Sequence, residues 1–470
     1  MSANELITKS VTELAPLIES KQVSPVEVTT ALLDHAKALN PEVNAYISFR
    51  EQALADARRA EDEISRGDYR GVFHGVPLAL KDNLYVGGEV TTMASKIHKD
   101  FVPAEDASVV RRLRKAGAVL TGKLNMHEYA WGIDNNNPHF GSVQNPWDPA
   151  KVPGGSSGGS GAGVAAHMTY ATLGTDTAGS IRIPSAACGI VGLKPTHGRV
   201  PKDGCFPLAW TLDHIGPMTK TVDDAAAMLQ VIAGFDAADP TAVDTPVGDY
   251  TSNLAGDVSG LVIGVEEDYY FRDVDNEIER LVRAQIDELV SRGARVQTVK
   301  IPTLRHSEWA ELATSLSEAS AIHHNDLLTR ADDFGADIRF LFELGELFSS
   351  VDYLQAQQVR RQLKNDFAAA LSEVDVLIAP TLPVMAPDIG SSEADLNGTK
   401  VDLIDSFIRF TGPSNLTGLP AMSVPVGFNG DLPVGLQIIG RAFDERTVLN
   451  VGKSIEAGGP MGDRTPAVLR

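Results

Sequence analysis

The chain has 470 residues, of which 43% are apolar and 22% are charged, close to average globular usage. Its formal net charge of −21 argues against nucleic-acid binding, which needs a basic surface, and against binding to an anionic membrane. No run of about 18 apolar residues occurs, so no membrane-spanning helix is predicted. Residues 1–9 lack a basic segment followed by an apolar one, and no secretory signal is expected there.

Only two cysteines occur, Cys188 and Cys205. Two thiols cannot build a disulfide framework, and such sparse use fits a reducing compartment. We therefore expect a cytoplasmic protein in which each cysteine serves as a small buried apolar residue.

The first 66 residues are predicted to form helices. Ser10 and Glu13 have the spacing of a capping box before an apolar run. The segment 24–27, Ser-Pro-Val-Glu, is a stronger start signal, since Pro suits the first helical position. A third helix is expected over 51–65, ending at Gly67.

The pattern then changes to short apolar runs that alternate with helices. Residues 76–80 predict a buried strand that ends at Lys81-Asp82-Asn83, followed by a helix over 106–115 and a strand over 118–120. A β-α-β unit of this kind predicts a parallel strand pair. A second such unit is a strand at 261–265, a helix around 278–290 and a strand at 294–299.

Three further strands are expected at 376–378, 422–426 and 435–439, the last two joined by a hairpin turn at Asn429-Gly430. Residues 236–257 show no clear element. No compositional boundary divides the chain, so we predict an α/β fold in a single large domain. Its central twisted sheet is expected to be mixed, mostly parallel and covered by helices on both faces. Within it we distinguish N-terminal helices (1–66), a core (70–220), substrate-pocket elements (258–410) and closing strands with a helix (411–470).

A Gly/Ser-rich stretch at 154–161 precedes an Ala-rich helical run at 162–168. Its small residues could form an anion-holding nest, but neither a Gly-Lys-Ser/Thr sequence nor a preceding strand supports phosphate or dinucleotide binding. It formally matches the Gly-x-Ser-x-Gly hydrolase elbow, yet the turn-forming residues 145–149 stand where that motif needs a strand. The downstream His167 and His214, like His197, are more typical of structural histidines.

A second small-residue loop covers 174–184. Its backbone N–H groups could stabilise a developing oxyanion, and Asp176 and Arg182 could form an ion pair across the turn. An ordinary glycine turn before a capped helix is the simpler alternative.

Together these segments closely resemble the amidase signature family. The resemblance rests on residues 75–82, the two loops just described, and residues 192–196, 379–381 and 415–421. It implies the amidase signature fold, an amide-hydrolysing activity without metal or other cofactor, and a Ser–Ser–Lys catalytic triad whose middle serine follows a cis peptide bond.

Matched residue by residue, the resemblance makes Lys81 the base, Ser156 the relay and Ser180 the nucleophile. It places the oxyanion hole on the backbone of Thr177, Ala178, Gly179 and Ser180. Many family members have Gly where this chain has Ala178. Because an N–H group remains there, we expect the oxyanion hole to be retained unless the position needs a positive φ.

The residues themselves support this chemistry. A serine hydroxyl is a poor nucleophile until a base takes its proton, and a lysine can be that base only if burial lowers its pKa. Lys81, at the end of a buried strand, meets this condition; Lys123, also near a strand end, is the rival. No Ser-x-x-Lys motif occurs, and His127-Glu128 lacks the second histidine of a zinc site.

Other residues are expected to support the site. Ser157 and Ser160 are predicted to hold the first loop by hydrogen bonds, and Asp176 with Arg182 to hold the second. Substrate choice is expected to depend on the segments 129–137, 309–353 and 383–410. Aromatic residues there suggest an apolar acyl or aryl pocket, although core packing explains them equally well. The named candidates are Met126, Tyr129, Trp131 and Phe340.

The main functional hypothesis is an amidohydrolase that cleaves a small linear amide, with esters or carbamates, as in urethanases or aryl acylamidases, as further substrates. We expect a monomer or homodimer. One alternative is the glutamine-hydrolysing member of the same family, the glutamyl-tRNA amidotransferase A subunit, which releases ammonia from glutamine within a heterotrimer; segments such as 122–126 and 145–148 resemble it. A remote alternative is an inactive binding protein with the same fold.

Overall fold

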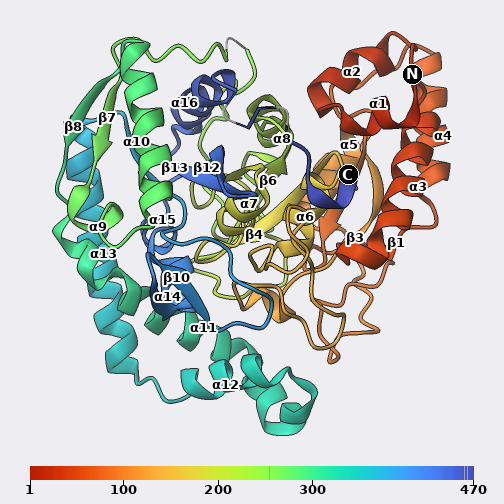
Figure 1. The fold of residues 1–470 in the computed structure, drawn as a ribbon. Helices are drawn as coiled ribbons and strands as arrows, with labels where there is room; N and C mark the ends of the chain where they lie inside the picture. The colour runs from red at the N-terminus through yellow and green to blue at the C-terminus, as the bar shows by residue number, and fades with distance from the viewer. Residues whose placement is uncertain (253, 460, 463) are drawn as a thin grey trace.

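An eleven-stranded sheet runs through the centre of the molecule in the computed structural model, which describes residues 1–252, 254–459, 461–462 and 464–470 (Figure 1). In their order across the sheet, the strands are β1 (Tyr46–Phe49), β3 (Val119–Leu124), β2 (Pro77–Lys81), β4 (Ala171–Asp176), β6 (His214–Thr219), β5 (Val191–Lys194), β12 (Ala421–Asn429), β13 (Leu432–Gly440), β9 (Val376–Pro380), β7 (Val262–Val265) and β8 (Arg295–Thr298). A separate hairpin pairs β10 (Glu393–Leu396) with β11 (Thr399–Asp402).

Helices cover both faces of the sheet, which confirms the predicted α/β fold with a mixed central sheet. They are α1 (Ala3–Thr8), α2 (Val11–Glu19), α3 (Pro25–Val43), α4 (Ala53–Ser65), α5 (Ser108–Lys115), α6 (Gly158–Ala165), α7 (Arg182–Cys188), α8 (Val222–Ile232), α9 (Glu267–Tyr270), α10 (Asn276–Ser291), α11 (Ser307–Arg330), α12 (Ala336–Gly345), α13 (Ser350–Glu373), α14 (Leu403–Arg409), α15 (Gly412–Thr417) and α16 (Glu445–Ala457). Short 3₁₀ turns lie at Glu128–Ala130, Pro302–His306, Ala331–Asp333 and Ala467–Leu469.

Parallel pairing occurs in two blocks. β2 pairs in parallel with β3 and β4, and β7 pairs in parallel with β8 and β9. Both predicted β-α-β units are therefore confirmed, with α5 and α10 as their crossover helices. Among the described strands the other six pairings of this sheet are antiparallel: β1 pairs with β3 at one edge, and the five pairings from β4 to β9 alternate in direction through β6, β5, β12 and β13 across its middle.

The predicted N-terminal helix signals are confirmed. The Ser10 side chain accepts from the Glu13 N–H and the Glu13 side chain accepts from the Ser10 N–H, which completes a capping box. Ser24 caps α3, with Pro25 in the first helical turn. The third helix starts two residues later than expected and ends at the predicted Ser65.

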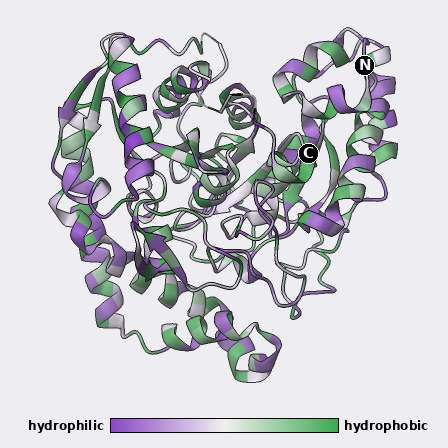
Figure 2. Ribbon diagram, viewed as in Figure 1, coloured by the Kyte–Doolittle hydropathy of each residue, from purple (hydrophilic) through white to green (hydrophobic). Residues whose placement is uncertain are grey.

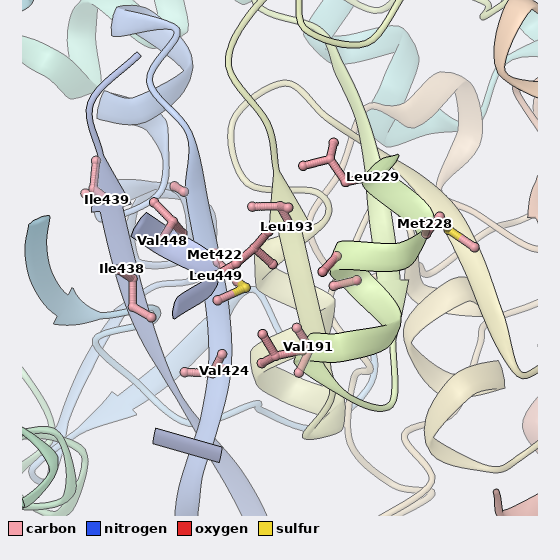
Figure 3. Packing of buried hydrophobic residues seen from close by; sticks show 14 of the residues in the cluster. Val191, Leu193, Met228, Leu229, Met422, Val424, Ile438, Ile439, Val448 and Leu449 are labelled. Atoms are coloured by element: carbon pink, nitrogen blue, oxygen red, sulfur yellow. The ribbon is translucent and has the colours of Figure 1, made fainter. Parts of the chain in front are cut away.

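Two faces of the central strands have different composition. Leu193, Met422 and Ile438 occupy neighbouring positions on β5, β12 and β13, and they belong to the large apolar cluster that α8 and α16 complete (Figure 3). On the opposite face, small residues allow close approach of α7: a side chain at Gly192 would meet the Ser185 Oγ at 2.1 Å. Helix α7 therefore lies directly on the sheet.

Four strands of this sheet, β1, β4, β5 and β6, were not predicted. β4, β5 and β6 are buried over their whole length, so they lack the alternation of polar and apolar residues by which a strand is recognised. The helix expected at 162–168 starts earlier, at Gly158, since glycine lets it approach the backbone: a side chain at Gly159 would lie 2.4 Å from the Asn125 carbonyl oxygen.

The surface helices show mixed hydropathy (Figure 2), whereas the central strands β2, β4, β5 and β6 are buried over their whole length. α10, for example, buries Ile278, Val282, Ile286 and Leu289 and exposes charged residues on its other side. Among the described residues, no helix is both long and apolar enough to cross a bilayer. No helix or strand forms in the described part of 236–257.

We expect Leu193→Ala to lower the free energy of unfolding by about 2–5 kcal/mol, because it leaves a cavity in the centre of the main apolar cluster. Denaturant unfolding followed by circular dichroism measures this loss. Leu328→Ala, at a position 72% exposed, is the matched control and should leave the midpoint unchanged. Equal effects of both substitutions would contradict this assignment of the core.

Candidate active site

Lys81 is the last residue of β2, and its side chain is fully buried. Its Nζ donates hydrogen bonds to the Ser156 Oγ and to the Thr175 Oγ1, each over 2.8 Å. Burial lowers the pKa of Lys81 to about 7, although the negative charges of Asp176 and Asp213 oppose the shift. The structure thus places an amine that can be neutral near physiological pH against a serine hydroxyl.

Ser156 lies in the Gly/Ser-rich loop, directly before α6. The Gly155–Ser156 peptide bond is cis, as the family resemblance implied. Ser157 donates to the Thr175 carbonyl oxygen at 3.3 Å, as expected of a supporting residue. The prediction for Ser160 was wrong, because its hydroxyl is buried within the helix–sheet contact without a hydrogen-bond partner among the described residues.

The second loop joins β4 to α7 and contains Ser180, which is only 7% exposed and lines the adjoining cavity. Thr177 donates to Asp213 at 2.6 Å. The left-handed position is Gly179, with φ of 142°, where a side chain would meet the Thr411 Oγ1 at 2.3 Å. Ala178 has no positive φ, so its methyl group does not disturb the loop.

The N–H groups of Thr177, Ala178, Gly179 and Ser180, the four predicted for the oxyanion hole, make no hydrogen bond with any described residue, so four donors of one loop remain available. No hydrogen bond joins the described Ser180 and Ser156 side chains either. Hydrogen bonds of a hydrolytic relay commonly tighten only when substrate binds.

Asp176 and Arg182 form the predicted pair, and both are completely buried. The Arg182 guanidinium donates to both carboxylate oxygens of Asp176 and also to Asn415 (2.7 Å) and Ser414 (2.6 Å). Burial alone would raise the pKa of Asp176, but the adjacent Arg182 holds it below its usual range. The pair closes the 177–180 loop at its base and ties it to α15.

The rival lysine, Lys123, belongs to another cluster. It lies 3.4 Å from Asp82 and donates to the Leu84 carbonyl oxygen and to Thr91. The structure therefore keeps this amine away from the serines of both loops. Of the two cysteines, Cys188 is buried as expected, whereas Cys205 is partly exposed and its Sγ accepts from Asn83 at 3.7 Å.

A cavity of about 550 Å³ opens beside the 177–180 loop. All three segments expected to choose the substrate contribute to it. Its wall contains His127, Ala130, Trp131, Gly132, Ile133, Asp134, Asn136, Pro138, Thr177, Ala178, Ser180, Leu208, Glu311, Leu312, Ser315, Ala336, Asp337, Leu341, Gly390, Ser391, Ser392, Asp402, Leu403, Ile404 and Ile408.

Of the named pocket candidates only Trp131 lines this cavity. Met126 and Tyr129 instead belong to a buried cluster in which the Tyr129 ring packs against His323 and Phe342. Phe340, which is 62% exposed, lies on the surface. Core packing therefore explains Met126 and Tyr129, because sequence spacing cannot tell which aromatic side chains turn away from a cavity.

Histidine and acid side chains dominate the charged part of the cavity wall. His127 lies between Asp134 and Asp337, at 3.1 and 3.0 Å. Burial opposes a positive charge on this histidine, but the two carboxylates outweigh burial and raise the pKa of His127 to about 9. The imidazolium thereby links the 127–138 segment to α12. No group of three or more potential metal ligands occurs among the described residues.

Sequence reasoning missed Thr175, the second acceptor of the Lys81 amine, and Asp213, which holds Thr177. The role of Thr175 could not be recognised from the sequence, because β4, which contains it, was not predicted. Asp213 directly precedes β6, another strand that was not predicted, and the pairing of β6 with β4 brings it to the loop.

We expect Asp176→Asn to lower the free energy of unfolding by at least about 3 kcal/mol, because it leaves the Arg182 charge buried without its carboxylate. Chemical denaturation measures this loss. Asp332→Asn breaks an ion pair at a position 98% exposed and should leave the denaturation midpoint unchanged. An unchanged midpoint for Asp176→Asn would contradict a structural role of the pair.

The Amidase family model matches residues 27–449 of the chain. The chain is 41% identical to the A subunit of glutamyl-tRNA(Gln) amidotransferase from Carboxydothermus hydrogenoformans over 477 residues, covering 96% of this chain and 97% of that protein. It is also 41% identical to an amidase of Pseudomonas putida over 468 residues, 99% of each. One solved structure comes from a vestigial protein complex that reveals the evolutionary origins of an s-triazine catabolic enzyme. It superposes on this chain with a TM-score of 0.92 at 32% identity, covering 96% of this chain and 99% of that chain. The chain therefore belongs to the amidase signature family of enzymes that act on carbon–nitrogen bonds.

Proposed function

We propose that this protein hydrolyses small linear amides through an acyl-enzyme, with Ser180 as nucleophile, Ser156 as proton relay and Lys81 as base. The observation that carries the proposal is the 2.8 Å contact between the desolvated Lys81 amine and the Ser156 hydroxyl, next to a cavity that Ser180 lines. The family similarity supports the same assignment.

In the first half-reaction the Ser180 Oγ attacks the amide carbonyl carbon while its proton passes to Ser156, whose own proton passes to the neutral Lys81 amine. The carbonyl oxygen becomes an oxyanion. The unoccupied N–H groups of Ala178, Gly179 and Ser180 are suited to stabilise it. Return of the proton through Ser156 to the departing nitrogen releases ammonia or an amine and leaves an ester on Ser180.

In the second half-reaction water attacks this ester. The neutral amine of Lys81 again takes a proton through Ser156, and collapse of the intermediate releases the carboxylic acid and restores the Ser180 hydroxyl. Esters and carbamates with good leaving groups can enter the same sequence, because each can acylate a serine.

The second candidate is the glutamine-hydrolysing component of a tRNA amidotransferase, which the 41% identity to such a protein favours. The composition of the cavity wall argues against free glutamine as the substrate. Within the described residues that form it, no Lys or Arg is present to bind a substrate carboxylate. A small amide without a carboxylate fits the cavity better, and we rank amide hydrolysis first.

We expect Ser180→Ala to abolish hydrolysis and Lys81→Ala to lower kcat by about 10²–10⁴-fold, the range typical of a lost general base. Release of ammonia from primary amides and of aniline from anilides measures both. Intact-protein mass spectrometry with a fluorophosphonate should show one adduct on the wild type and none on Ser180→Ala. Near-full activity of Lys81→Ala would refute the base assignment, and an unlabelled wild type would favour a binding protein.

The pH dependence provides a second check. Lys81 must be neutral to accept a proton, and its pKa is lowered to about 7. We therefore expect kcat/KM for an uncharged amide to be low in acid and to rise with pH around a midpoint near 7. A stopped assay across this range measures the profile, with circular dichroism as a control for folding. A profile that falls as pH rises through 7 would contradict a neutral-amine base.

Measuring ammonia release from glutamine and from small neutral amides with the isolated chain separates the two candidates. Preference for the neutral amides supports the first. Hydrolysis of glutamine alone, or activity that requires added partner proteins, supports the second.

A further inference from the structure

Glu311 is a buried acid group that the proposed mechanism does not use. It lies in the first turns of α11, and its side chain packs against α15: a side chain at Gly412 would lie 3.4 Å from the Glu311 Cγ. The residue is 2% exposed, and neither carboxyl oxygen has a hydrogen-bond partner among the described residues. Buried carboxyl groups are almost always paired, so this one calls for an explanation.

Glu311 lines the same cavity as Thr177, Ala178 and Ser180. A ligand in that cavity therefore lies beside both the 177–180 loop and the Glu311 side chain. Neither of the nearby arginines donates a hydrogen bond to the Glu311 carboxyl group. Arg182 is engaged with Asp176 and α15, and Arg360 donates to Thr211 and the Leu416 carbonyl oxygen.

The other acids of the cavity wall already have partners. Asp134 and Asp337 hold His127, and Asp402 caps α14 by accepting from the Asp405 N–H. Among the described wall residues, Glu311 is thus the acid whose carboxyl oxygens both lack a hydrogen-bond donor. His127, already engaged, is the one basic side chain of this wall, so the wall favours a cation over an anion.

We propose that Glu311 is a specificity-determining residue that binds a protonated amine on the substrate, so that the preferred substrates are small amides carrying an ammonium group. This inference rests on the proposed amide hydrolysis and defines its substrate class. Burial raises the pKa of the Glu311 carboxyl group well above its usual value, with Arg360 opposing and Glu318 adding to the shift. Binding of the ammonium would then release the carboxyl proton and leave a carboxylate–ammonium pair.

The kinetic test uses ω-amino primary amides of increasing chain length and α-amino amides, each paired with the alkanamide that has a methyl group in place of the ammonium. For the wild type we expect kcat/KM to favour at least one amino amide over its partner by about tenfold or more, the effect of one charge-assisted hydrogen bond. Glu311→Gln should lose this preference and retain hydrolysis of the alkanamide.

Glu318→Gln is the matched control. Glu318 lies two turns further along α11, is also buried, and accepts from Thr211 and Tyr353, outside the cavity wall. This variant should keep the wild-type preference. A wild type that does not distinguish the paired amides, or a preference that survives in Glu311→Gln, would overturn the inference while amide hydrolysis itself stands.

Calorimetry with alkylammonium ions tests the inference without turnover. We expect Glu311→Gln to weaken binding by about tenfold or more. Titrations at neutral pH in buffers of different ionisation enthalpy should show release of a proton by the wild type and none by the variant. Equal affinities would reject the ammonium site, whether or not any amide is hydrolysed; loss of hydrolysis with intact ammonium binding would instead reject the proposed reaction.

Discussion

The buried pair of Asp176 and Arg182 is the interaction on which the geometry of the site depends. It joins the end of β4 to the first residue of α7, and the intervening loop carries Ser180 and the four N–H groups that have no partner among the described residues. Two charges this deep are tolerated because the guanidinium also donates to Asn415 and Ser414. Loop, helix and α15 are thus fixed relative to one another by one hydrogen-bonded centre.

The buried lysines of this protein have different hydrogen-bond and charge partners. Lys123 lies beside the carboxylate of Asp82, and its protonated form is thereby partly stabilised. Lys194 donates to the carbonyl oxygens of Pro195 and Leu419. Burial lowers the pKa of Lys194, and the positive charge of Arg182 lowers it further. Lys81 contacts two hydroxyl groups and no carboxylate among the described residues. A base that must give up and take back a proton needs such neutral partners, which distinguishes Lys81 from its neighbours.

Local signals predicted the outer parts of the fold well. The caps at Ser10 and Ser24, and both β-α-β units, follow from residues close together in the chain. The central strands β4, β5 and β6 were not predicted, because burial on both faces removes the alternation of polar and apolar residues that marks a strand. Family resemblance suggested Lys81, Ser156 and Ser180 as the catalytic residues, and spacing alone suggested Asp176 with Arg182. Thr175, Asp213 and Glu311 depend on strand pairing and helix packing, which no local pattern encodes.

In the proposed mechanism, reaction type and substrate choice depend on different parts of the molecule. The loops that carry Ser156 and Ser180 are anchored to the sheet, where any change disturbs a packed core. The opposite wall of the cavity comes from α11, α12 and the 390–408 region, which lie outside the sheet. The chain is 41% identical both to an amidase and to a component of an amidotransferase. We propose that the charges on that outer wall, which are acidic at Glu311, Asp337 and Asp402, select the substrate.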